Sequence, residues 1–420
     1  MSLLASRLEQ QQKLHPSAID LTLARVREVA ARMGLLERAQ RASYRAITVA
    51  GTNGKGSTVA YIDALLRASG KRTGRFTSPH LRRYNERIAV DGVDATDDEL
   101  LACFDRVDAA RGEITLTFFE YNALAALDHF RQREVEFAVL EVGLGGRLDA
   151  TNIIDADVAV VCSIGIDHAD WLGGTLAEIG REKAGIFRAG RPAVFARADL
   201  PYSVGEVAAE LGARPVIAGR DFAARTHATG WDFEMGSLQL TDLPPPGIAG
   251  TQQVANAAAA LAALVCAGAL DVLDASRVAT ALTHTQLPGR FQIVPGEVEW
   301  VLDVAHNVPA AEALAANLRT LERRRTLAVC GILGDKDIRG IAEAVSRDID
   351  AWCLVALEGP RAVSLDELAS RLPAGAVVVN RASDVAAACR VARAAASPGD
   401  RIVVFGSFLT VGPALDFLAI

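Results

Sequence analysis

The apolar positions of this chain fall into short continuous runs rather than into an alternating pattern. Three such runs lie in the first half, at Arg45–Ala50, Phe137–Val142 and Val158–Ser163. Runs of this length are typical of strands covered on both faces, as in a parallel sheet with helices on each side. A predicted helix, Thr58–Leu66, follows the first run. The pattern therefore predicts an α/β fold.

The pattern restarts after a break at Leu287-Pro288-Gly289-Arg290. Five further strands are predicted beyond it, at 298–304, 326–330, 351–356, 376–379 and 401–405, with helices between them. We therefore expect two domains, comprising residues 1–292 and 293–420. Within the first domain, shorter strands with turns at about 193–245 predict a small side sheet.

The stretch Gly51–Ser57 lies between a predicted strand and a predicted helix and reads GTNGKGS. Glycines let backbone N–H groups converge on an anion, the helix N-terminus adds its dipole, and Lys55 adds a positive charge. The spacing departs from the usual G-x-x-x-x-G-K-[ST] loop, because Val49 holds the first glycine position and Gly56 follows the lysine. An ordinary strand-to-helix turn is the alternative, but a lysine between two glycines contributes little to packing. We predict a phosphate-binding loop.

Composition narrows the class of protein. The chain has 420 residues, half of them hydrophobic, and a net charge of −7, which argues against nucleic acid as the main partner. Its six cysteines are scattered without a Cys-x-x-Cys pair, as expected for reduced thiols of a cytoplasmic protein. The apolar patch Leu3–Ala5 is too short for a signal peptide, and Ala257–Leu270 is too short for a membrane span. We expect a cytoplasmic, monomeric enzyme with no membrane partner.

Glu141 is a charged residue at the end of an otherwise apolar predicted strand, and a glycine-rich stretch, 143–152, follows it. The carboxyl ends of parallel strands form the ligand crevice of open α/β sheets. A carboxylate there is costly unless it meets a cation, so we predict a metal ligand. The alternative is an ion pair with Arg147. The glycines do not form a dinucleotide fingerprint, because position 148 is leucine.

Two further polar residues follow predicted strands. His168 comes after the strand that ends near Ser163, and Ser78 comes after a run at 74–77. A lone histidine is more often structural than a ligand, and Mg²⁺ prefers oxygen. The position of His168 nevertheless favours a metal ligand, and Ser78 offers a hydroxyl oxygen. We expect the neighbouring His80 to make local hydrogen bonds.

Taken together, these motifs resemble the folate branch of the Mur ligase superfamily, the bifunctional dihydrofolate synthase/folylpolyglutamate synthase type. The resemblance implies a Mur-ligase-like α/β fold, with a P-loop ATPase domain built on a parallel sheet and a smaller Rossmann-like C-terminal domain. The matching stretches run nearly end to end: Gly51–Ser57, Thr77–Leu81, Leu116–Tyr121, Leu140–Asn152, Asp167–Gly173, Arg181–Ile186, Leu287–Arg290, Asp303–Asn307 and Phe405–Phe408.

The resemblance implies an ATP-dependent carboxylate–amine ligase. Such an enzyme activates a substrate carboxylate as an acyl phosphate, which the amine of L-glutamate then attacks. The implied substrates are dihydropteroate and tetrahydrofolates, with ATP and two Mg²⁺ ions as cofactors. Closure of two domains around a shared ATP site would exclude the water that hydrolyses an acyl phosphate.

The resemblance also implies roles for individual residues. The ATP-binding residues would be Thr52, Asn53, Gly54, Lys55, Gly56, Ser57, Asn256, Arg290 and Asp303. The catalytic residues would be Lys55, Lys183 and Arg290, with Lys183 modified to a carbamate. The metal ligands would be Ser78, Glu141 and His168. The pterin-bearing substrate would contact Asp20, Leu21, Thr22, Leu23, Thr117, Phe118, Phe119, Glu120, Leu148, Asp149 and Ala150.

Several of these assignments have alternatives. Asp303 could be a helix N-cap, and Lys183 could be an ordinary lysine paired with Glu182 or Glu178. Asn256 lies in a stretch that matches loosely. At the level of function, the alternatives are another Mur-superfamily amide ligase and a nucleotide-gated regulatory ATPase.

Overall fold

The computed structural model describes residues 2–36, 42–269 and 274–420. These residues form two compact units. The N-terminal unit comprises the described residues up to Ile164 together with Leu172–Pro246 and Val254–Thr285, and the C-terminal unit comprises Gly165–Trp171, Gly247–Gln253 and Gln286–Ile420. The division expected from the sequence, 1–292 and 293–420, stays a prediction. Among the described residues, no helix has the length and apolar character needed to cross a membrane.

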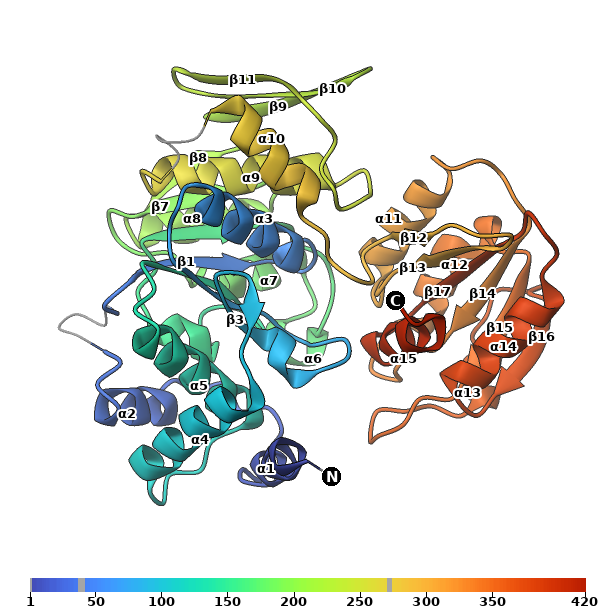
Figure 1. Ribbon diagram of the computed structural model, residues 1–420, viewed down its shortest axis with the longest axis horizontal. Coiled ribbons are helices and arrows are strands. Elements are labelled where there is room, and N and C mark those ends of the chain that lie inside the picture. The colour runs from blue at the N-terminus through green and yellow to red at the C-terminus, as the bar shows by residue number, and fades with distance from the viewer. Residues whose placement is uncertain (1, 37–41, 270–273) are drawn as a thin grey trace. The chain divides into compact units, whose positions relative to one another are not determined.

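The N-terminal unit is built on an eight-stranded sheet in the order β4-β3-β2-β5-β1-β6-β7-β8 (Figure 1). The six strands from β2 to β8 in that order run parallel, and β3 and β4 add an antiparallel edge. The bounds are β1 Arg45–Ala50, β2 Thr73–Phe76, β3 Ile88–Val90, β4 Val93–Asp94, β5 Phe137–Glu141, β6 Val158–Val161, β7 Pro192–Phe195 and β8 Arg214–Ile217. The predicted parallel sheet is confirmed.

Helices cover both faces of this sheet. Helix α3 packs on β1, β2 and β5, whereas α5 packs on β2 and on α4, and the two helices lie on opposite sides of β1 in Figure 1. The bounds are α1 Leu3–Gln12, α2 Ala24–Arg32, α3 Lys55–Ala68, α4 Asp97–Arg111, α5 Phe118–Gln132, α7 Leu176–Ala184, α8 Tyr202–Glu210, α9 Gln253–Cys266 and α10 Ala275–His284, with 3₁₀ turns η1 Tyr84–Arg87 and η2 Ala150–Ile153. Leu270, the last residue of the predicted apolar helix, lies outside the described residues.

The side sheet is smaller than the sequence suggested. It consists of the antiparallel strands β9 Phe222–His227, β10 Gly230–Met235 and β11 Leu238–Leu243. The segment before it forms β7, α8 and β8, a strand–helix–strand unit whose strands pair in parallel within the main sheet. The extent expected for the side sheet, about 193–245, therefore merged the last two strands of the main sheet with the three-stranded sheet.

The C-terminal unit contains a six-stranded sheet in the order β12-β13-β17-β14-β15-β16, parallel except for β12. The strands are β12 Gln292–Val294, β13 Glu299–Leu302, β14 Thr326–Cys330, β15 Ala351–Val355, β16 Val378–Ala382 and β17 Arg401–Phe405. The helices are α11 Val308–Leu318, α12 Ile338–Val345, α13 Leu365–Ser370, α14 Val385–Ala395 and α15 Phe408–Leu418, with η3 Ser346–Asp348. The short helix α6, Ala169–Leu172, ends where the chain returns to the N-terminal unit.

Candidate active site

The phosphate-loop candidate joins β1 to α3. Gly54 occupies the N-cap position of α3 in the left-handed conformation, with φ of 86°, and makes no side-chain cap hydrogen bond. The first turn of the helix, from Gly56 to Thr58, is buried. A Cβ on Gly54 would lie 2.8 Å from Oδ1 of Asn256, so both the backbone angle and the space require glycine. The N-terminus of α3 thus has the form of an anion-binding site.

The same contact places Asn256 against the loop. This asparagine lies near the start of α9 and is buried, with 9% of its surface exposed. Its predicted role was a nucleotide contact, and its position beside Gly54 is compatible with that role. The loop is also closely packed at Gly51, where an added Cβ would lie 3.0 Å from Cβ of Cys162.

Two lysines converge on one carbonyl oxygen of the loop. Nζ of Lys55 donates to the carbonyl oxygens of Gly51 and Thr52, at 2.9 and 3.2 Å. Nζ of Lys183, from the last turn of α7, donates to the same Gly51 oxygen at 3.1 Å. Lys183 is 5% exposed. Because like charges repel strongly away from bulk water, two amines at one oxygen favour the arrival of an anion beside them.

Glu182 and Glu178, the alternative ion-pair partners of Lys183, make other contacts. The carboxylate of Glu182 accepts hydrogen bonds from the Arg147 guanidinium at 2.7 and 3.0 Å. Glu178 forms a capping box with Thr175 at the start of α7. Lys183 itself donates to the Gly51 carbonyl oxygen.

Glu141 and Ser78 lie together at the carboxyl ends of β5 and β2. Oε2 of Glu141 accepts a hydrogen bond from the backbone N–H of Ser78 at 3.3 Å, and Glu141 is 4% exposed. In the sheet, Glu141 pairs in register with Val49 of β1, directly before the phosphate loop. The alternative partner of Glu141, Arg147, instead binds Glu182.

The pKa of the buried Cys162 thiol is affected by three charged residues of this region. Burial raises the pKa of Cys162 to about 11. The positive charges of Lys55 and Lys183 act to lower that pKa, and the charge of Glu141 acts to raise it. The contacts agree with this, because Lys55 and Lys183 share the Gly51 carbonyl and Glu141 pairs in register with Val49, two positions before Gly51.

The predicted substrate residues also lie in the N-terminal unit. Thr117 caps α5 and forms a capping box with Glu120. The Arg25 guanidinium joins Glu120 to Asp20, with distances of 3.2 and 2.7 Å. Asp20, Thr117 and Glu120 are thus parts of one hydrogen-bonded network, and residues 21–23 lead directly into α2.

The remaining predicted substrate residues surround the same helices. Asp149 caps η2 and accepts the backbone N–H groups of Gly143 and Leu144, each at 2.9 Å. Burial raises the pKa of the Asp149 carboxyl, and these hydrogen bonds oppose that shift. The apolar side chains pack against the hydrophobic core beneath α2, α4 and α5: Phe118, Phe119, Leu148 and, fully within it, Leu23 and Ala150.

Two predicted ATP-binding residues belong to the C-terminal unit. The guanidinium of Arg290 lies over the ring of Phe408, 5.4 Å from its centroid. The Asp303 carboxylate accepts the backbone N–H groups of Phe291 and Ala305, at 2.9 and 2.8 Å. Burial raises the pKa of Asp303 to about 6, although the charge of Arg290 acts to lower it. The N-cap role considered for Asp303 belongs to Asn307, which caps α11.

His168, the third predicted metal ligand, lies in the C-terminal unit with φ of 53°. Its Nε2 is 3.5 Å from Nζ of Lys336, which binds Oδ1 of Asp167 at 2.6 Å. Asn307 donates to the other oxygen of Asp167 at 2.9 Å. Burial acts to raise the pKa of Asp167, but the Lys336 ammonium and its neighbours outweigh burial and hold the pKa well below its usual range. Because Glu141 belongs to the other unit, a metal shared by His168 and Glu141 stays a prediction.

Lys336 is a candidate that the sequence analysis missed. Its side chain is 7% exposed and it follows β14, in the stretch Gly334-Asp335-Lys336-Asp337. Glu141 was predicted as a site residue because it is charged and ends an apolar strand. Lys336 follows the apolar strand β14 only after an intervening loop, but charged residues that follow an apolar strand are a related signal that could have identified it.

Comparison with known proteins decides the family. The Mur ligase middle domain matches residues 49–264, and the Mur ligase glutamate ligase domain matches residues 289–408. The chain belongs to the Mur ligase family. It is 42% identical over 416 residues to the dihydrofolate synthase/folylpolyglutamate synthase of Escherichia coli strain K12, covering 99% of this chain and 95% of that protein. It is 35% identical over 452 residues to the Mycobacterium tuberculosis protein of the same name, covering 96% and 91%.

Solved structures of Mur ligases agree with this assignment. E. coli FolC in complex with DHPP and ADP superposes with a TM-score of 0.93 at 42% identity, covering 100% of this chain and 98% of that chain. A Yersinia pestis bifunctional folylpolyglutamate synthase/dihydrofolate synthase complexed with AMPPNP and Mn ion gives a TM-score of 0.91 at 42% identity, covering 100% and 99%. The predicted family, its α/β fold and its function as a ligase are confirmed. The nucleotides and the Mn ion in the related structures agree with the predicted cofactors, ATP with a divalent metal.

Proposed function

We propose that this Mur ligase joins L-glutamate both to dihydropteroate and to the γ-carboxyl group of tetrahydrofolates, in each case through an acyl phosphate. Full-length similarity to proteins named for both activities supports the substrate class. The observation that carries the proposal is the meeting of Lys55 and Lys183 on the Gly51 carbonyl beside Glu141. Phosphoryl transfer needs positioned charge more than covalent chemistry by the protein, and this cluster supplies it.

The phosphate loop has the charge and the open backbone approach that the phosphates of ATP require. The uncapped N-terminus of α3 offers backbone N–H groups, and glycine at position 54 keeps the approach open beside Asn256. Lys55, which in this structure donates to loop carbonyls, would turn its ammonium to the phosphates. We assign ATP binding to Thr52, Asn53, Gly54, Lys55, Gly56, Ser57 and Asn256 of the N-terminal unit and to Arg290 and Asp303 of the C-terminal unit.

The divalent metal fits the donor set of Glu141 and Ser78. A buried carboxylate and a neighbouring hydroxyl are oxygen donors, which Mg²⁺ prefers. When bound, Mg²⁺ neutralises charge on the phosphate oxygens during transfer. We propose Glu141 and Ser78 as ligands, with His168 as the ligand from the C-terminal unit. The role of the protein is to hold these donors in place and to keep water away from the transferred group.

Lys183 is proposed to act as a carbamate. Its neutral amine would attack CO₂, forming one N–C bond and releasing one proton. The product is anionic, so it would replace the repulsion between two ammonium groups at Gly51 by an attraction to Lys55 or to a metal ion. The position of Lys183 supports this proposal, because the side chain is buried and donates to the same Gly51 carbonyl as Lys55.

The second substrate, L-glutamate, requires cationic and amide donors for its carboxylates. In the C-terminal unit, Lys336 and Asn307 together bind the Asp167 carboxylate, and donors of this kind would suit a carboxylate of L-glutamate. In the N-terminal unit, the network of Asp20, Arg25 and Glu120 offers polar groups to a pterin. These features support a pterin-bearing substrate in the N-terminal unit and L-glutamate in the C-terminal unit.

We further propose that the protein acts as a monomer in the cytoplasm. We also propose a domain division at 292/293, with an ATP-binding domain before it and a ligase domain after it. The two matched family domains, which end at 264 and begin at 289, support a division in this part of the chain.

The test is a product assay with purified protein, ATP, Mg²⁺ and L-glutamate. Dihydropteroate is supplied in one reaction and tetrahydrofolate in another, and products are identified by mass spectrometry. We expect addition of one glutamyl residue to dihydropteroate and of one or more to tetrahydrofolate. Product from only one of the two substrates would refute the bifunctional assignment. Product from neither, together with substrate-independent ATP hydrolysis, would favour a regulatory ATPase.

A further inference from the structure

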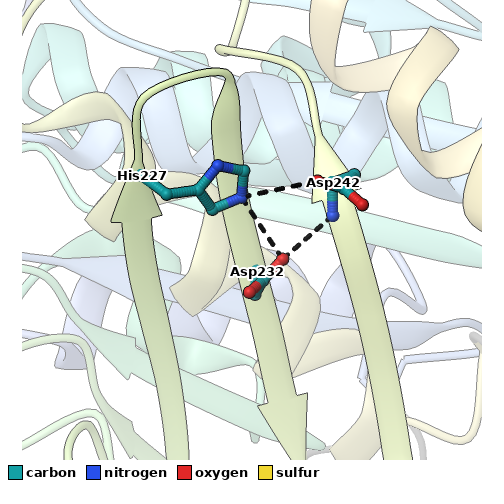
Figure 2. Close-up of side chains that lie close together, drawn as sticks. All are labelled: His227, Asp232 and Asp242. Carbon is teal, nitrogen blue, oxygen red and sulfur yellow. Dashed lines mark hydrogen bonds and ion pairs between the residues drawn. The ribbon is translucent and has the colours of Figure 1, made fainter.

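A cluster of three metal-ligating side chains lies outside the candidate active site, on the three-stranded side sheet. His227 ends β9, Asp232 lies in β10 and Asp242 lies near the end of β11, so each strand contributes one residue (Figure 2). One ligand atom from each residue lies within 4.8 Å of the other two. We propose that these three side chains bind a zinc ion that ties the strands of the side sheet together.

The strand register explains why the three side chains meet. Trp231 and Phe233 of β10 are buried, so Asp232 between them points to the outer face. Across β10 and β11, Trp231 pairs with Leu243 but Phe233 pairs with Leu240, so β11 carries one extra residue opposite Asp232. This β-bulge adds Asp242 to the outer face, with φ of 54°. Without the extra residue, a single β11 side chain would face Asp232.

The histidine presents the nitrogen that a metal would use. Nδ1 of His227 is 3.2 Å from Oγ1 of Thr229, so its hydrogen bond is made within the β9–β10 turn. Nε2 faces both carboxylates, 3.4 Å from Oδ1 of Asp232 and 3.8 Å from Oδ1 of Asp242 (Figure 2). Thr229 Oγ1 can accept from Nδ1–H, and the tautomer that makes this bond carries the lone pair on Nε2, as metal-bound imidazoles do.

The distances match zinc coordination. With Zn–N and Zn–O bonds of about 2.0 to 2.2 Å and tetrahedral angles, neighbouring ligand atoms are about 3.4 Å apart. The His227–Asp232 distance already has this value, and the exposed Asp242 side chain needs only a small rotation. Asp232 is also oriented, because its Oδ1 accepts the backbone N–H of Asp242 at 2.9 Å. One nitrogen and two carboxylate donors suit Zn²⁺ better than Mg²⁺, and water would complete the coordination.

The net negative charge of the cluster favours binding of a cation. With a neutral imidazole, the cluster carries two negative charges. Arg225 lies opposite Asp232 in the β9–β10 register, but its guanidinium binds both carboxylate oxygens of Glu234, at 2.5 and 2.9 Å. The charge of Arg225 is therefore compensated by Glu234 and not by Asp232. A zinc ion would neutralise the cluster and join three strands that otherwise hold together by their ladder and one apolar face.

The test is zinc binding by the full-length protein after chelator treatment, with excess Mg²⁺ present to fill the predicted active-site metal position. Zn²⁺ is titrated in competition with a chromophoric chelator. We expect one zinc ion per chain in the wild type and at least about tenfold weaker binding in His227→Gln and in Asp242→Asn. His284→Gln removes an exposed histidine on α10 and is the matched control, which should bind zinc as the wild type does.

Two further measurements decide the location of the ion. Zinc should raise the melting temperature of the wild type and of Glu141→Gln but not that of His227→Gln, with circular dichroism confirming that each variant is folded. In zinc-soaked crystals, an anomalous difference peak should lie between the three side chains. Unchanged zinc binding in His227→Gln, no zinc binding by the wild type, or loss of binding in Glu141→Gln alone would each overturn the proposal. The cluster would then be a pair of histidine–carboxylate ion pairs.

Discussion

The two units of the molecule each bury a lysine near the carboxyl ends of a parallel sheet, but they give it different partners. Lys183 in the N-terminal unit donates to the backbone carbonyl of Gly51 at 3.1 Å. Lys336 in the C-terminal unit binds the Asp167 carboxylate at 2.6 Å, and both of these side chains are at most 10% exposed. A carboxylate compensates a full positive charge, whereas a carbonyl offers only a dipole.

This difference separates two kinds of chemistry. A buried ion pair keeps both groups charged, and the low pKa of Asp167 is the sign of that at Lys336. Glu182, the neighbour of Lys183 in sequence, binds Arg147. Lys336 is thus the lysine that a buried ion pair keeps as a cation, and Lys183 is the lysine that we propose to be modified to a carbamate.

The largest effect is expected at Lys55, the other amine at the Gly51 carbonyl. Lys55→Ala should lower kcat about a thousandfold, because it removes a positive charge from the phosphates in the transition state. The fold should persist, since the side chain binds only loop carbonyls among its observed partners. Lys71→Ala, at an exposed ion pair with Glu136, is the control. More than about a tenth of wild-type activity in Lys55→Ala would contradict the assignment of the ATP site.

Lys183→Ala should lower activity about a hundredfold through loss of the carbamate. A short carboxylic acid such as acetate should restore part of it by supplying the missing anionic oxygens. Acetate should not rescue Lys55→Ala, because a cation is missing there. Arg181→Ala, an exposed residue on the same helix, should remain active. If high-resolution density shows a bare amine at Lys183 in nucleotide-bound crystals grown with bicarbonate, the carbamate is excluded.

Lys336→Met tests the buried ion pair between Lys336 and Asp167 through its effect on the free energy of unfolding. It leaves the Asp167 carboxylate buried without its cation, which should lower the free energy of unfolding by about 4 kcal/mol in urea denaturation. The double variant Lys336→Met/Asp167→Leu should recover much of that loss. Lys183→Met should cost less, because the hydrogen bond that it removes is to a backbone carbonyl. Equal losses for the two single variants would mean that the two lysines are not different in kind.

A smaller effect is expected from Asp303, a carboxylate held by backbone N–H groups. Its folded pKa, about 6, lies above the unfolded value of an aspartate, so the folded state binds its proton more tightly. This group's contribution to stability therefore falls as pH rises from about 4 to about 6 and is constant above. Asp303→Asn removes this loss. The free energy of unfolding at pH 7, relative to that at pH 4, should therefore be higher in Asp303→Asn than in the wild type, by on the order of 2 kcal/mol. An unchanged difference in urea unfolding would show that the carboxyl group titrates normally.

Much of the fold was predictable because its strands are continuous apolar runs. The predicted strands at 326–330 and 401–405 coincide with β14 and β17, whose residues are all buried. The extent of the side sheet was not predictable, because short strands at 192–217 give the same local signal whether they join the main sheet or a separate one. Pairing partners that lie far apart in sequence decide that question.

The candidate site was predictable where chemistry follows a strand, as at Gly51–Ser57 and Glu141. What the sequence could not show is which groups neutralise each other. Asp167 and Lys336 are 169 positions apart, and the sequence around either residue does not predict their ion pair. The convergence of Lys183 on the Gly51 carbonyl, 132 positions away, is equally invisible in the sequence.

The most direct test of the central claim is phosphate release by the purified protein, with dihydropteroate and L-glutamate added singly and together in the presence of ATP and Mg²⁺. A ligase that protects its acyl phosphate from water should release phosphate rapidly only when both substrates are present. We expect phosphate release to be at least about tenfold faster with both substrates than with either alone. The same rate with neither, one or both substrates would contradict it.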